Sequence, residues 1–549
     1  MRNTRKVLND IVEEDKPRND MALTKIQKIG VGGICMFIFS FLFSGVILPP
    51  IVKHEVKKKV ALKQGWMMRE VWGKFPFSFE FHFYMFNVTN HMDIKGGAKP
   101  IVAEVGPFVY EEWQEKVNQV DHDEDDTISY NAKSTFIFNA EKSKGLTGEE
   151  EVIMPHFFIL GTVNAVLRDK ASAMPIVSKA LDSIFRKPDS IFVKAKVREI
   201  LFDGLVIDCN VKDFAGSAVC NEIAQNYEEF RLQPIGDNKY SLSLFGLING
   251  TENKARHRVK RGLKNIMEVG KVVEYDGKNN VSVWDNEICD AFNGTDGSVF
   301  HPYFDKKGKD DLVAFNAGLC RSVICHYDSD TKFAGLKLLR YTTDLGTDVD
   351  KYPHHKCYCV TPDRCPKKGA MDIFKCVNAP IMITNPHFYL ADPWYVSAIE
   401  GVKPDREKHM IMIDIDPFTG SPIHVHTRAQ FNMFLQPVEK FKLMKTFPNA
   451  LLPLIWFDEI LILPDFLLKE IKGGHRQVAM AKVFKFLMMF GGLGMAGYAG
   501  FMHYKATKGE NTTEVKKVPV KSSPNGVGSG EKKINISTIQ PAPLPANVD

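Results

Sequence analysis

The sequence lacks an excess of charge of either sign. Its 71 lysine and arginine residues nearly balance its 66 aspartate and glutamate residues, so the formal net charge is only +5 over 549 residues. Such a balance implies neither a nucleic-acid partner nor an acidic substrate. The sequence also has no internal repeat and no heptad array, so neither a repeat protein nor a coiled coil is expected.

Signature motifs of common enzymes are also missing. The sequence contains no G-x-S-x-G, no Walker A motif and no H-E-x-x-H. A G-x-G-x-x-G occurs at Gly492–Gly497, but it lies inside an apolar run, where it cannot follow a strand and cradle a pyrophosphate. We therefore expect no catalytic residue and no cofactor.

Two clusters resemble metal sites, but other structures explain them better. Asp121–Asp126 carries acidic and imidazole groups, yet it lacks the glycine and the terminal glutamate of an EF-hand, so we expect a solvated turn. Cys357, Cys359 and Cys365 lie beside the pair His354–His355, but no C-x₂-C pair is present. We expect disulfides there and no metal ion.

Long apolar runs are rare, and there are two. Ile29–Leu48 is twenty residues without a charge, which at about 1.5 Å per residue spans a bilayer core of about 30 Å. A cleaved signal peptide is the alternative, but its apolar core would be shorter and no convincing A-x-A site follows. Phe486–Met502 is seventeen uncharged residues, and a buried core helix is its alternative, but only a polar tail follows it. The expected organisation is a cytosolic arm (1–28), a transmembrane helix (29–48), an extracellular domain (49–483), a second transmembrane helix (484–503) and a disordered cytosolic tail (504–549).

Cysteines cluster between the two apolar runs, where nine of the ten are found. Because disulfides form in oxidising compartments, this clustering places the long loop outside the cytosol and both termini inside it. N-glycosylation sequons in the loop agree with this topology, at Asn87, Asn249, Asn280 and Asn293. We therefore predict a two-pass plasma-membrane protein with a large extracellular loop.

The spacing of the cysteines suggests one local bridge. Cys209 and Cys220 are a plausible pair, and six others suggest three bridges whose connectivity the spacing cannot give: Cys289, Cys320, Cys357, Cys359, Cys365 and Cys376. Cys325 is then left over.

The extracellular segment begins with a strict alternation of aromatic residues. Every second residue is phenylalanine, at Phe75, Phe77, Phe79, Phe81 and Phe83. This period of two predicts a strand with one buried, aromatic face. Core packing is one interpretation of that face, and the lining of a lipid cavity is the other, and the pattern alone does not separate them.

A helical region interrupts these β-like runs at about residues 149–205. Apolar residues recur at three- and four-residue spacing in Phe157–Leu167, Ile176–Phe185 and Ile191–Leu205, which predicts three short helices in a mainly β (α+β) domain. The region is rich in basic residues, including Arg186, Lys187, Lys194 and Lys196. A basic helical cap attracts anionic ligands or partners, although an ordinary solvated helix surface has the same composition.

Two further patterns have alternative interpretations. Arg258–Arg261 has the form of a dibasic processing site, but a strand edge that carries basic residues explains it as well. Small residues recur every fourth position at Gly492, Ala496 and Gly500, which favours close helix contact in lipid and predicts a homo-oligomer through this face.

The order of several motifs resembles the class B scavenger receptor family. The motifs are Phe86–Asn90 (FNVTN), Glu104–Tyr110 (EVGPFVY), Phe300–Phe304 (FHPYF), Leu319–Ser322 (LCRS) and Pro386–Phe388 (PHF). Asp125–Tyr130, Leu146–Glu150 and the pair of Cys209 and Cys220 are similar to those of insect sensory neuron membrane proteins. The resemblance covers about residues 29–502, whereas the long N-terminal arm departs from it and the tail shows none.

This resemblance implies a fold and a function beyond the residue patterns. It implies an antiparallel β-barrel-like ectodomain with a three-helix head and an internal hydrophobic tunnel, and the disulfides Cys289–Cys357, Cys320–Cys376 and Cys359–Cys365. The basic position that gates ligand entry in the family falls near Arg186 and Lys187, where Pro188 disturbs the match. The implied function is a receptor or co-receptor that binds fatty-acid-derived pheromones or odorants and passes them to the membrane or to a neighbouring odorant receptor.

Three hypotheses from different classes follow. A lipid receptor or conduit predicts that long-chain ligands bind the ectodomain, where each buried CH₂ contributes about 0.8 kcal/mol. An adhesion or scaffolding protein predicts a protein partner at the helical head and no lipid. An ectoenzyme predicts turnover of an ester, against the missing motifs.

Overall fold

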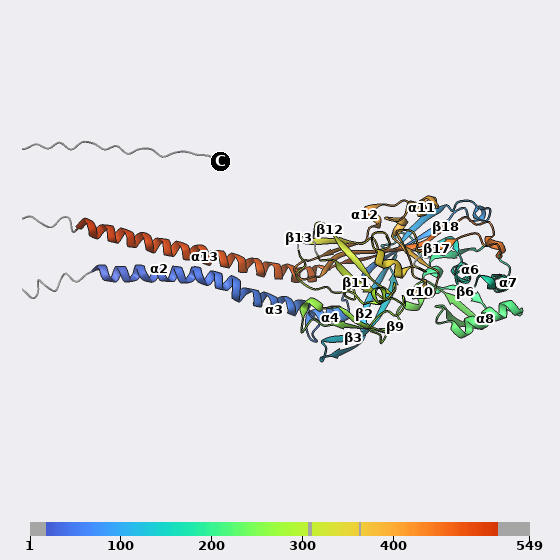
Figure 1. The fold of residues 1–549 in the computed structure, drawn as a ribbon, viewed down its shortest axis with the longest axis horizontal. Coiled ribbons are helices and arrows are strands. Elements are labelled where there is room, and N and C mark those ends of the chain that lie inside the picture. The colour runs from blue at the N-terminus through green and yellow to red at the C-terminus, as the bar shows by residue number, and fades with distance from the viewer. Residues whose placement is uncertain (1–17, 306–309, 362–363, 514–549) are drawn as a thin grey trace, which may run out of the picture. The chain divides into compact units, whose positions relative to one another are not determined.

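The computed structural model describes residues 18–305, 310–361 and 364–513 (Figure 1). The chain divides into two compact units, of which one comprises Met1–Val46 and Lys482–Asp549 and the other is Ile47–Ala481. The predicted arm lies outside the described residues as far as residue 17, and the predicted tail lies outside them from residue 514 onward.

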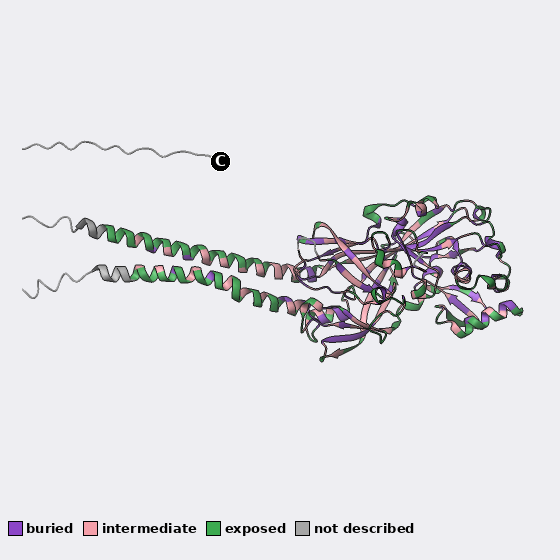
Figure 2. Cartoon of the chain, viewed as in Figure 1, coloured by how far each residue is buried: buried purple, intermediate pink, exposed green. Residues whose placement is uncertain are grey.

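The first unit contains one long apolar helix and the larger part of another, whose start belongs to the second unit. Helix α2 (Arg18–Leu42) continues into a π-helical turn (Phe43–Ile47), and α13 (Asp465–Thr513) extends past both ends of the second predicted span. By length and composition both helices can cross a membrane. Their large apolar side chains, such as Phe41 and Leu487, are exposed (Figure 2), as expected of helices whose solvent is lipid.

Glycines bring α2 and α13 into direct contact. A Cβ added at Gly33 would lie 2.8 Å from the carbonyl oxygen of Gly492 and 2.6 Å from the backbone nitrogen of Ala496. These two small residues therefore serve a contact within one chain, whereas a Cβ at Gly500 would meet nothing within 4 Å, and the homo-oligomer through this face stays a prediction. Small residues mark a close approach in lipid without specifying which helix approaches, which is why the sequence pattern identified the face but not its partner.

The second unit is built on a 13-stranded antiparallel sheet. Eleven strands run in the order β10-β9-β3-β2-β1-β18-β17-β16-β13-β12-β11, and β15 joins β17 and carries β14. The bounds are β1 (Phe79–Val88), β2 (Val102–His122), β3 (Thr127–Phe138), β9 (Glu252–Lys260), β10 (Val272–Tyr275), β11 (Leu312–Asn316), β12 (Arg321–Phe333), β13 (Leu336–Thr342), β14 (Ala370–Asp372), β15 (Met382–Thr384), β16 (Met412–Ile415), β17 (Pro422–Leu435) and β18 (Ala450–Ile462).

The two edges of this sheet are bridged, which gives it the predicted barrel-like form. Thr295 forms an isolated antiparallel bridge with Lys271, next to β10, and a parallel bridge with Ala314 of β11. The backbone nitrogen of Phe315 donates to the carbonyl of Thr295 at 2.8 Å, so one short segment satisfies both edges. The sheet therefore encloses an interior.

Shorter elements complete the unit. Two small sheets are formed by β4 (Glu151–Pro155) with β5 (Phe192–Lys196), and by β6 (Leu205–Asp208), β8 (Lys239–Leu242) and β7 (Gln233–Gly236). The helices are α3 (Leu48–Val60), α4 (Met67–Gly73), α5 (His91–Ile94), α6 (Phe157–Asp169), α7 (Met174–Ile184), α8 (Phe214–Asn226), α9 (Glu287–Asp290), α10 (Phe374–Val377), α11 (Pro393–Ser397) and α12 (Arg406–His409).

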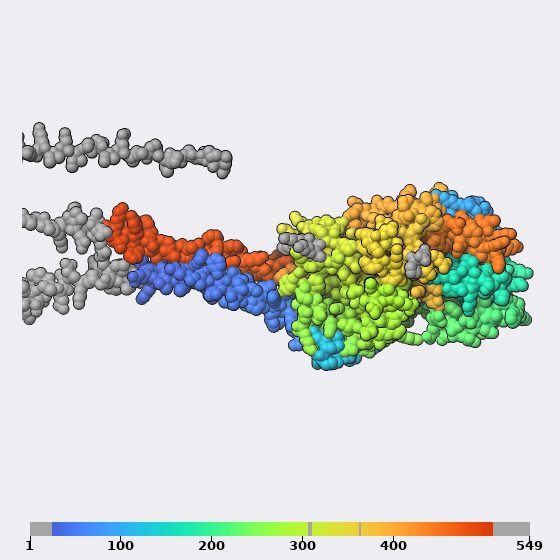
Figure 3. Space-filling view, in the orientation of Figure 1, coloured from blue at the N-terminus to red at the C-terminus, as the bar shows by residue number. Residues whose placement is uncertain are grey.

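A three-helix head is present, but its third helix is not the predicted one. Ile191–Leu205 is not one continuous helix: it contains β5, one π-helical turn, Glu199–Asp203, and the first residue of β6. Strand β5 forms because β4 supplies a pairing edge, which overrides the three- and four-residue spacing of its apolar residues. The third helix is α8, whose first turn is capped by the Asp213 carboxylate accepting from the backbone nitrogen of Gly216 at 2.8 Å. Helices α6–α8 gather at one end of this unit (Figures 1 and 3).

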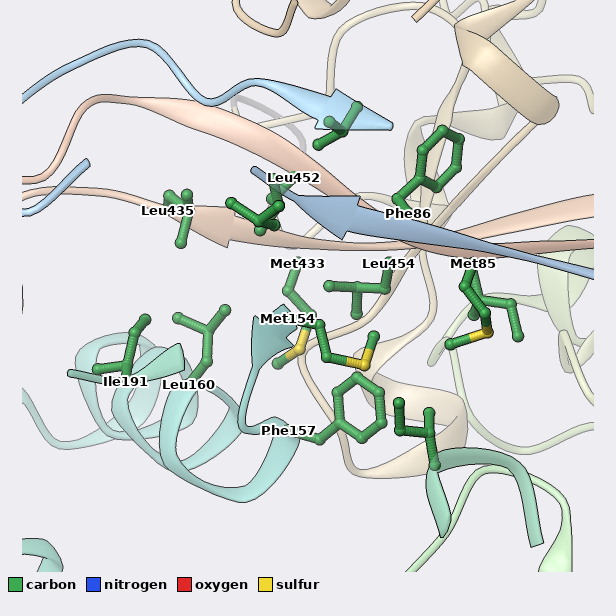
Figure 4. Close-up of a cluster of buried hydrophobic side chains, with 14 of the residues drawn as sticks. Met85, Phe86, Met154, Phe157, Leu160, Ile191, Met433, Leu435, Leu452 and Leu454 are labelled. Atoms are coloured by element: carbon green, nitrogen blue, oxygen red, sulfur yellow. The ribbon is translucent and has the colours of Figure 1, made fainter. Parts of the chain in front are cut away.

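The largest core lies between the head and the sheet. Phe157 and Leu160 of α6 point toward Met433 of β17 and Leu454 of β18 (Figure 4). Because α6 supplies a continuous apolar stripe, the head is held to the sheet by close packing of buried side chains.

Four disulfides stabilise the unit. Three are the pairs that the resemblance implied, and the fourth is the expected local bridge: Cys289–Cys357, Cys320–Cys376, Cys359–Cys365 and Cys209–Cys220. Of the described cysteines, Cys35 and Cys325 are unpaired.

Candidate binding cavity

The interior of Ile47–Ala481 contains a cavity of about 780 Å³. This volume lies in the range of about 300–1,000 Å³ that is typical of small-molecule sites. Its lining is mainly aliphatic and aromatic, and it comes from α3, α4, the start of α13 and the strands β1, β2, β11, β12 and β15–β18. The cavity is therefore built by segments that flank both predicted spans in the sequence, together with the inner face of the sheet.

The phenylalanine alternation divides between the two predicted roles. Phe75, Phe77 and Phe79 line the cavity, and the centroids of the Phe75 and Phe79 rings lie 5.0 Å apart. Phe81 and Phe83 belong to the core instead. Strand β1 begins only at Phe79, so the first two phenylalanines lie outside it.

Aromatic rings close the cavity on its core side. Phe431 and Phe457 line the cavity, and the Phe457 ring lies 4.8 Å from that of Phe81. Behind them the Phe245 ring lies 4.8 Å from that of Phe83. These rings belong to or pack against the same core that holds the head, so the cavity ends at packed aromatic side chains.

The four basic entrance candidates lie apart from the cavity. None of them is among the described residues that line it. Arg186 is 82% exposed and pairs with Asp208 at 2.8 Å. Lys194 and Lys196 pair with acidic residues of the neighbouring segment, and the backbone nitrogen of Lys187 donates to the backbone carbonyl of Asp182. The resemblance located a basic surface on the head, and in this conformation that surface does not open into the cavity.

Polar groups on the cavity wall were not anticipated from the sequence. Gln114 of β2 and Glu459 of β18 line the cavity, and Gln114 Nε2 donates to Glu459 Oε1 at 3.1 Å. Glu112, which is 5% exposed, lies close enough to Glu459 for the charges of the two carboxyls to interact. Burial, together with the adjacent Glu112 carboxyl, raises the pKa of Glu459 well above its usual range. The signal in the sequence is a charged residue at an inward position of an otherwise apolar strand.

The leftover cysteine also faces the cavity. Cys325 of β12 is buried and lines the cavity wall. Burial raises the pKa of its thiol to about 12. Because the thiolate is the reactive form, Cys325 is an inert part of the wall at neutral pH.

Arg261 is inaccessible as a processing site. It is 5% exposed, and its guanidinium lies among Asp121, Asp123 and Asp126 of the β2–β3 turn, 2.7 Å from Asp123. The acidic turn therefore binds an arginine of this chain. Among the described residues, no group of three or more histidine, cysteine or acidic side chains has the geometry to hold a metal ion.

Two of the motifs that carry the resemblance meet in space. His387 of the PHF motif contacts Glu104 of the EVGPFVY motif, with 2.6 Å between Nε2 and Oε2. The indole of Trp456 donates to the same carboxylate at 2.7 Å. These contacts tie three segments together and have a structural role.

The sequon asparagines differ in exposure. Asn280 and Asn293 are exposed, whereas Asn87 and Asn249 are half-buried. The side-chain oxygens of the latter two accept from the backbone nitrogens of Ile153 and Phe136. Glycosylation stays a prediction at all four.

Comparison with known proteins identifies the family. The family model of the CD36 family matches residues 31–503. Sensory neuron membrane protein 1 of Apis mellifera is 42% identical over 530 residues, which cover 96% of this chain and 99% of that protein. The proteins of the same name from Ostrinia nubilalis and Manduca sexta are 40% and 41% identical and cover 88% and 82% of this chain, or 91% and 86% of their own lengths. Since the family model spans nearly the whole described chain and these relatives match along most of their length, the chain belongs to the CD36 family.

Proposed function

We propose that this CD36-family membrane receptor binds an apolar, lipid-like ligand, such as a fatty-acid-derived odorant or pheromone, in the cavity of its ectodomain. The observation that carries the proposal is the cavity of about 780 Å³ with its mainly apolar wall. Empty apolar space of this size costs packing energy unless a ligand fills it. Burying a long hydrocarbon chain there gains about 0.8 kcal/mol for each CH₂.

The ligand then passes to the membrane or to a neighbouring odorant receptor. Support comes from the lining: Leu48, the last residue of the first predicted span, and Ala481, three residues before the second, both line the cavity. Transfer along a concentration gradient needs no catalytic group. The proposed topology places both termini in the cytosol and the cysteine-rich loop outside, at the plasma membrane.

A second candidate is a protein-binding or adhesion role through the head. Phe214, at the start of α8, is 85% exposed, and Val206 and Ile176 are 54% and 52% exposed. Large exposed apolar side chains favour a protein contact. The two roles are compatible, but only the first needs the cavity.

Photolabelling tests the proposal directly. The full-length chain in nanodiscs would be irradiated with a long-chain alcohol that carries a diazirine, and the adducts mapped by mass spectrometry. We expect adducts on cavity residues such as Phe77 and Ala429, in addition to those on the lipid-facing surface of α2 and α13.

A matched pair of variants makes the test specific. Ala429→Phe places a ring in the cavity and should abolish the cavity adducts, whereas Ala255→Phe, on β9 of the same sheet and away from the cavity lining, should retain them. Absence of cavity adducts in the unmodified chain, with binding of a protein partner lost in Phe214→Ala, would favour the second candidate.

A further inference from the structure

We propose that the cavity selects neutral, oxygen-bearing long-chain ligands, namely alcohols, aldehydes or esters, over long-chain carboxylates, through the inward-facing group Glu112, Gln114 and Glu459. The inference rests on the proposed function, because it names the ligand class of the same cavity.

The register of three strands places this group on the inner face of the sheet. Glu112 of β2 pairs with Phe79 of β1, and Glu459 of β18 pairs with Phe81. Directly opposed residues share a face, so both carboxyls lie on the face that carries the phenylalanines. Gln114, two residues beyond Glu112, is on that face as well. Gln114 and Glu459 line the cavity, and Glu112 lies behind them.

Burial of the two carboxyls favours retention of a proton by the pair. Glu112 Oε2 is buried and has no donor among the described groups, and the charge of the Glu112 carboxyl acts directly on Glu459. Two carboxylate oxygens make a hydrogen bond only if one carries the proton. Burial raises the pKa of Glu112, and burial together with the nearby Glu112 carboxyl raises the pKa of Glu459, which is consistent with a shared proton at neutral pH.

The other charged side chains of the wall do not compensate for this acidic group. The lining contains two cations, Lys59 and Arg428, and four acidic residues, Glu55, Asp296, Glu459 and Glu470. Glu470 pairs with Lys59 at 3.2 Å, and Asp458 holds the Arg428 guanidinium at 2.9 Å. Asp458 adds to the negative charge that Glu459 experiences. No free cation of the described lining is therefore available to a ligand carboxylate.

A buried ammonium nearby is engaged by other groups. Lys116 donates to the carbonyl of Trp72 at 3.2 Å, and its nitrogen lies 4.8 Å and 5.2 Å from the ring centroids of Trp72 and Phe75. It is not among the described lining residues, and its charge is offset by Asp296. It lies behind the aromatic wall.

This arrangement distinguishes ligands by their polar end. A hydroxyl, aldehyde or ester oxygen can exchange hydrogen bonds with the Gln114 amide and the Glu459 carboxyl while the hydrocarbon chain lies against the apolar wall. A carboxylate would lose its hydration and meet an acidic group with no cation to offset it. Neutral ligands therefore fit and ionised ones are excluded.

The test uses probes that differ only at the polar end. The full-length chain in phosphatidylcholine nanodiscs would be photolabelled at neutral pH with diazirine-bearing alcohol, methyl ester and carboxylic acid of one chain length. Cavity adducts would be normalised to adducts on the lipid-facing side chains of α13, which corrects for unequal partition of the probes into the bilayer. We expect the alcohol and ester to exceed the acid by about tenfold or more, the factor that one pKa unit of charge interaction represents.

Substitutions assign the selectivity to the proposed group. Glu112→Gln/Glu459→Gln should raise acid labelling until the ratio approaches unity, whereas Glu111→Gln, the neighbouring carboxylate on the opposite face of β2, should leave the ratio unchanged. Equal labelling by alcohol and acid in the unmodified chain would overturn this inference and leave the proposed function intact. Preferential labelling by the acid, lost in Lys116→Met, would overturn it in favour of that ammonium. Absence of cavity adducts with every probe would instead refute the proposed function.

Discussion

The two halves of the phenylalanine alternation have opposite surroundings. Phe81 and Phe83 are buried against other aromatic rings in the core that holds the head, whereas Phe75, Phe77 and Phe79 border an interior space. The residue type and the spacing are the same in both halves. What differs is the facing element: the core half meets rings from β3, β18 and the Glu199–Asp203 turn, and the cavity half faces α3, α4 and the start of α13. An aromatic stripe thus specifies which face is buried but not whether anything fills the space opposite.

The sharpest test of this contrast substitutes one ring on each side. Phe83→Ala removes a fully buried side chain and should lower the free energy of unfolding by about 3–5 kcal/mol. Phe77→Ala enlarges an existing cavity, so its effect on stability should be much smaller while ligand labelling of the cavity falls. Thermal unfolding of the two full-length variants, with photolabelling on each, measures both effects. Equal destabilisation would contradict the division of the stripe.

A change in the stability of the head should likewise leave ligand binding in the cavity unchanged. Cys209→Ser/Cys220→Ser removes the bridge of the α8 region and should destabilise the head by about 2–4 kcal/mol, the usual effect of a native disulfide. Because the head contributes no described residue to the cavity lining, cavity labelling should persist. Limited proteolysis would detect the loosened head, and loss of cavity labelling in this variant would show that the two regions are coupled.

The carboxyl pair on the cavity wall should make the stability of the protein depend on pH, whereas Glu111 on the outer face of β2 should not. The pKa values of Glu112 and Glu459 are raised in the folded state, so the folded chain holds protons more tightly than the unfolded chain. The contribution to stability is fully present below the ordinary carboxyl pKa of about 4.3 and is lost as pH rises above it. Glu112→Gln/Glu459→Gln should therefore raise the melting temperature more at pH 8 than at pH 5. Glu111→Gln provides the control, and a gain that is independent of pH would argue against a shared proton.

The smallest effect is expected at the exposed basic surface of the head. Arg186→Ala breaks a solvent-exposed ion pair and should change stability by at most about 1 kcal/mol. It should also leave the final extent of cavity labelling unchanged. A slower approach to that extent, measured by time-resolved labelling, would restore Arg186 as an entrance residue.

The sequence predicted those features that depend on local composition. The two apolar runs are helices, the alternation around Phe79–Phe83 is a strand, and α6 and α7 lie where three- and four-residue spacing placed them. The motif resemblance added the barrel-like sheet and the disulfide pairs. Predicting these features requires only the neighbouring residues in the sequence or a resemblance to a known family.

The features that the sequence did not predict depend on contacts between residues that are far apart in the chain. Ile191–Leu205 became strand and turn because β4 pairs with it, and the division of the phenylalanines depends on what faces them. The polar group on the cavity wall includes the hydrogen bond between Gln114 and Glu459, which are 345 residues apart in the sequence. No pattern within a window of the chain connects such residues.

The pairing of β1 with β18 has a consequence for how the chain is made. Phe83 lies opposite Phe457, so β1 is synthesised early but receives its second neighbour only when the last strand of the ectodomain has emerged. Until then β1 presents an open, aromatic edge, which is the kind of surface on which nascent chains aggregate. Contacts between such distant segments form slowly. We therefore expect maturation of this receptor to depend on protection of its N-terminal strands during translation, because a chain truncated before Ala450 lacks the strand that completes its sheet.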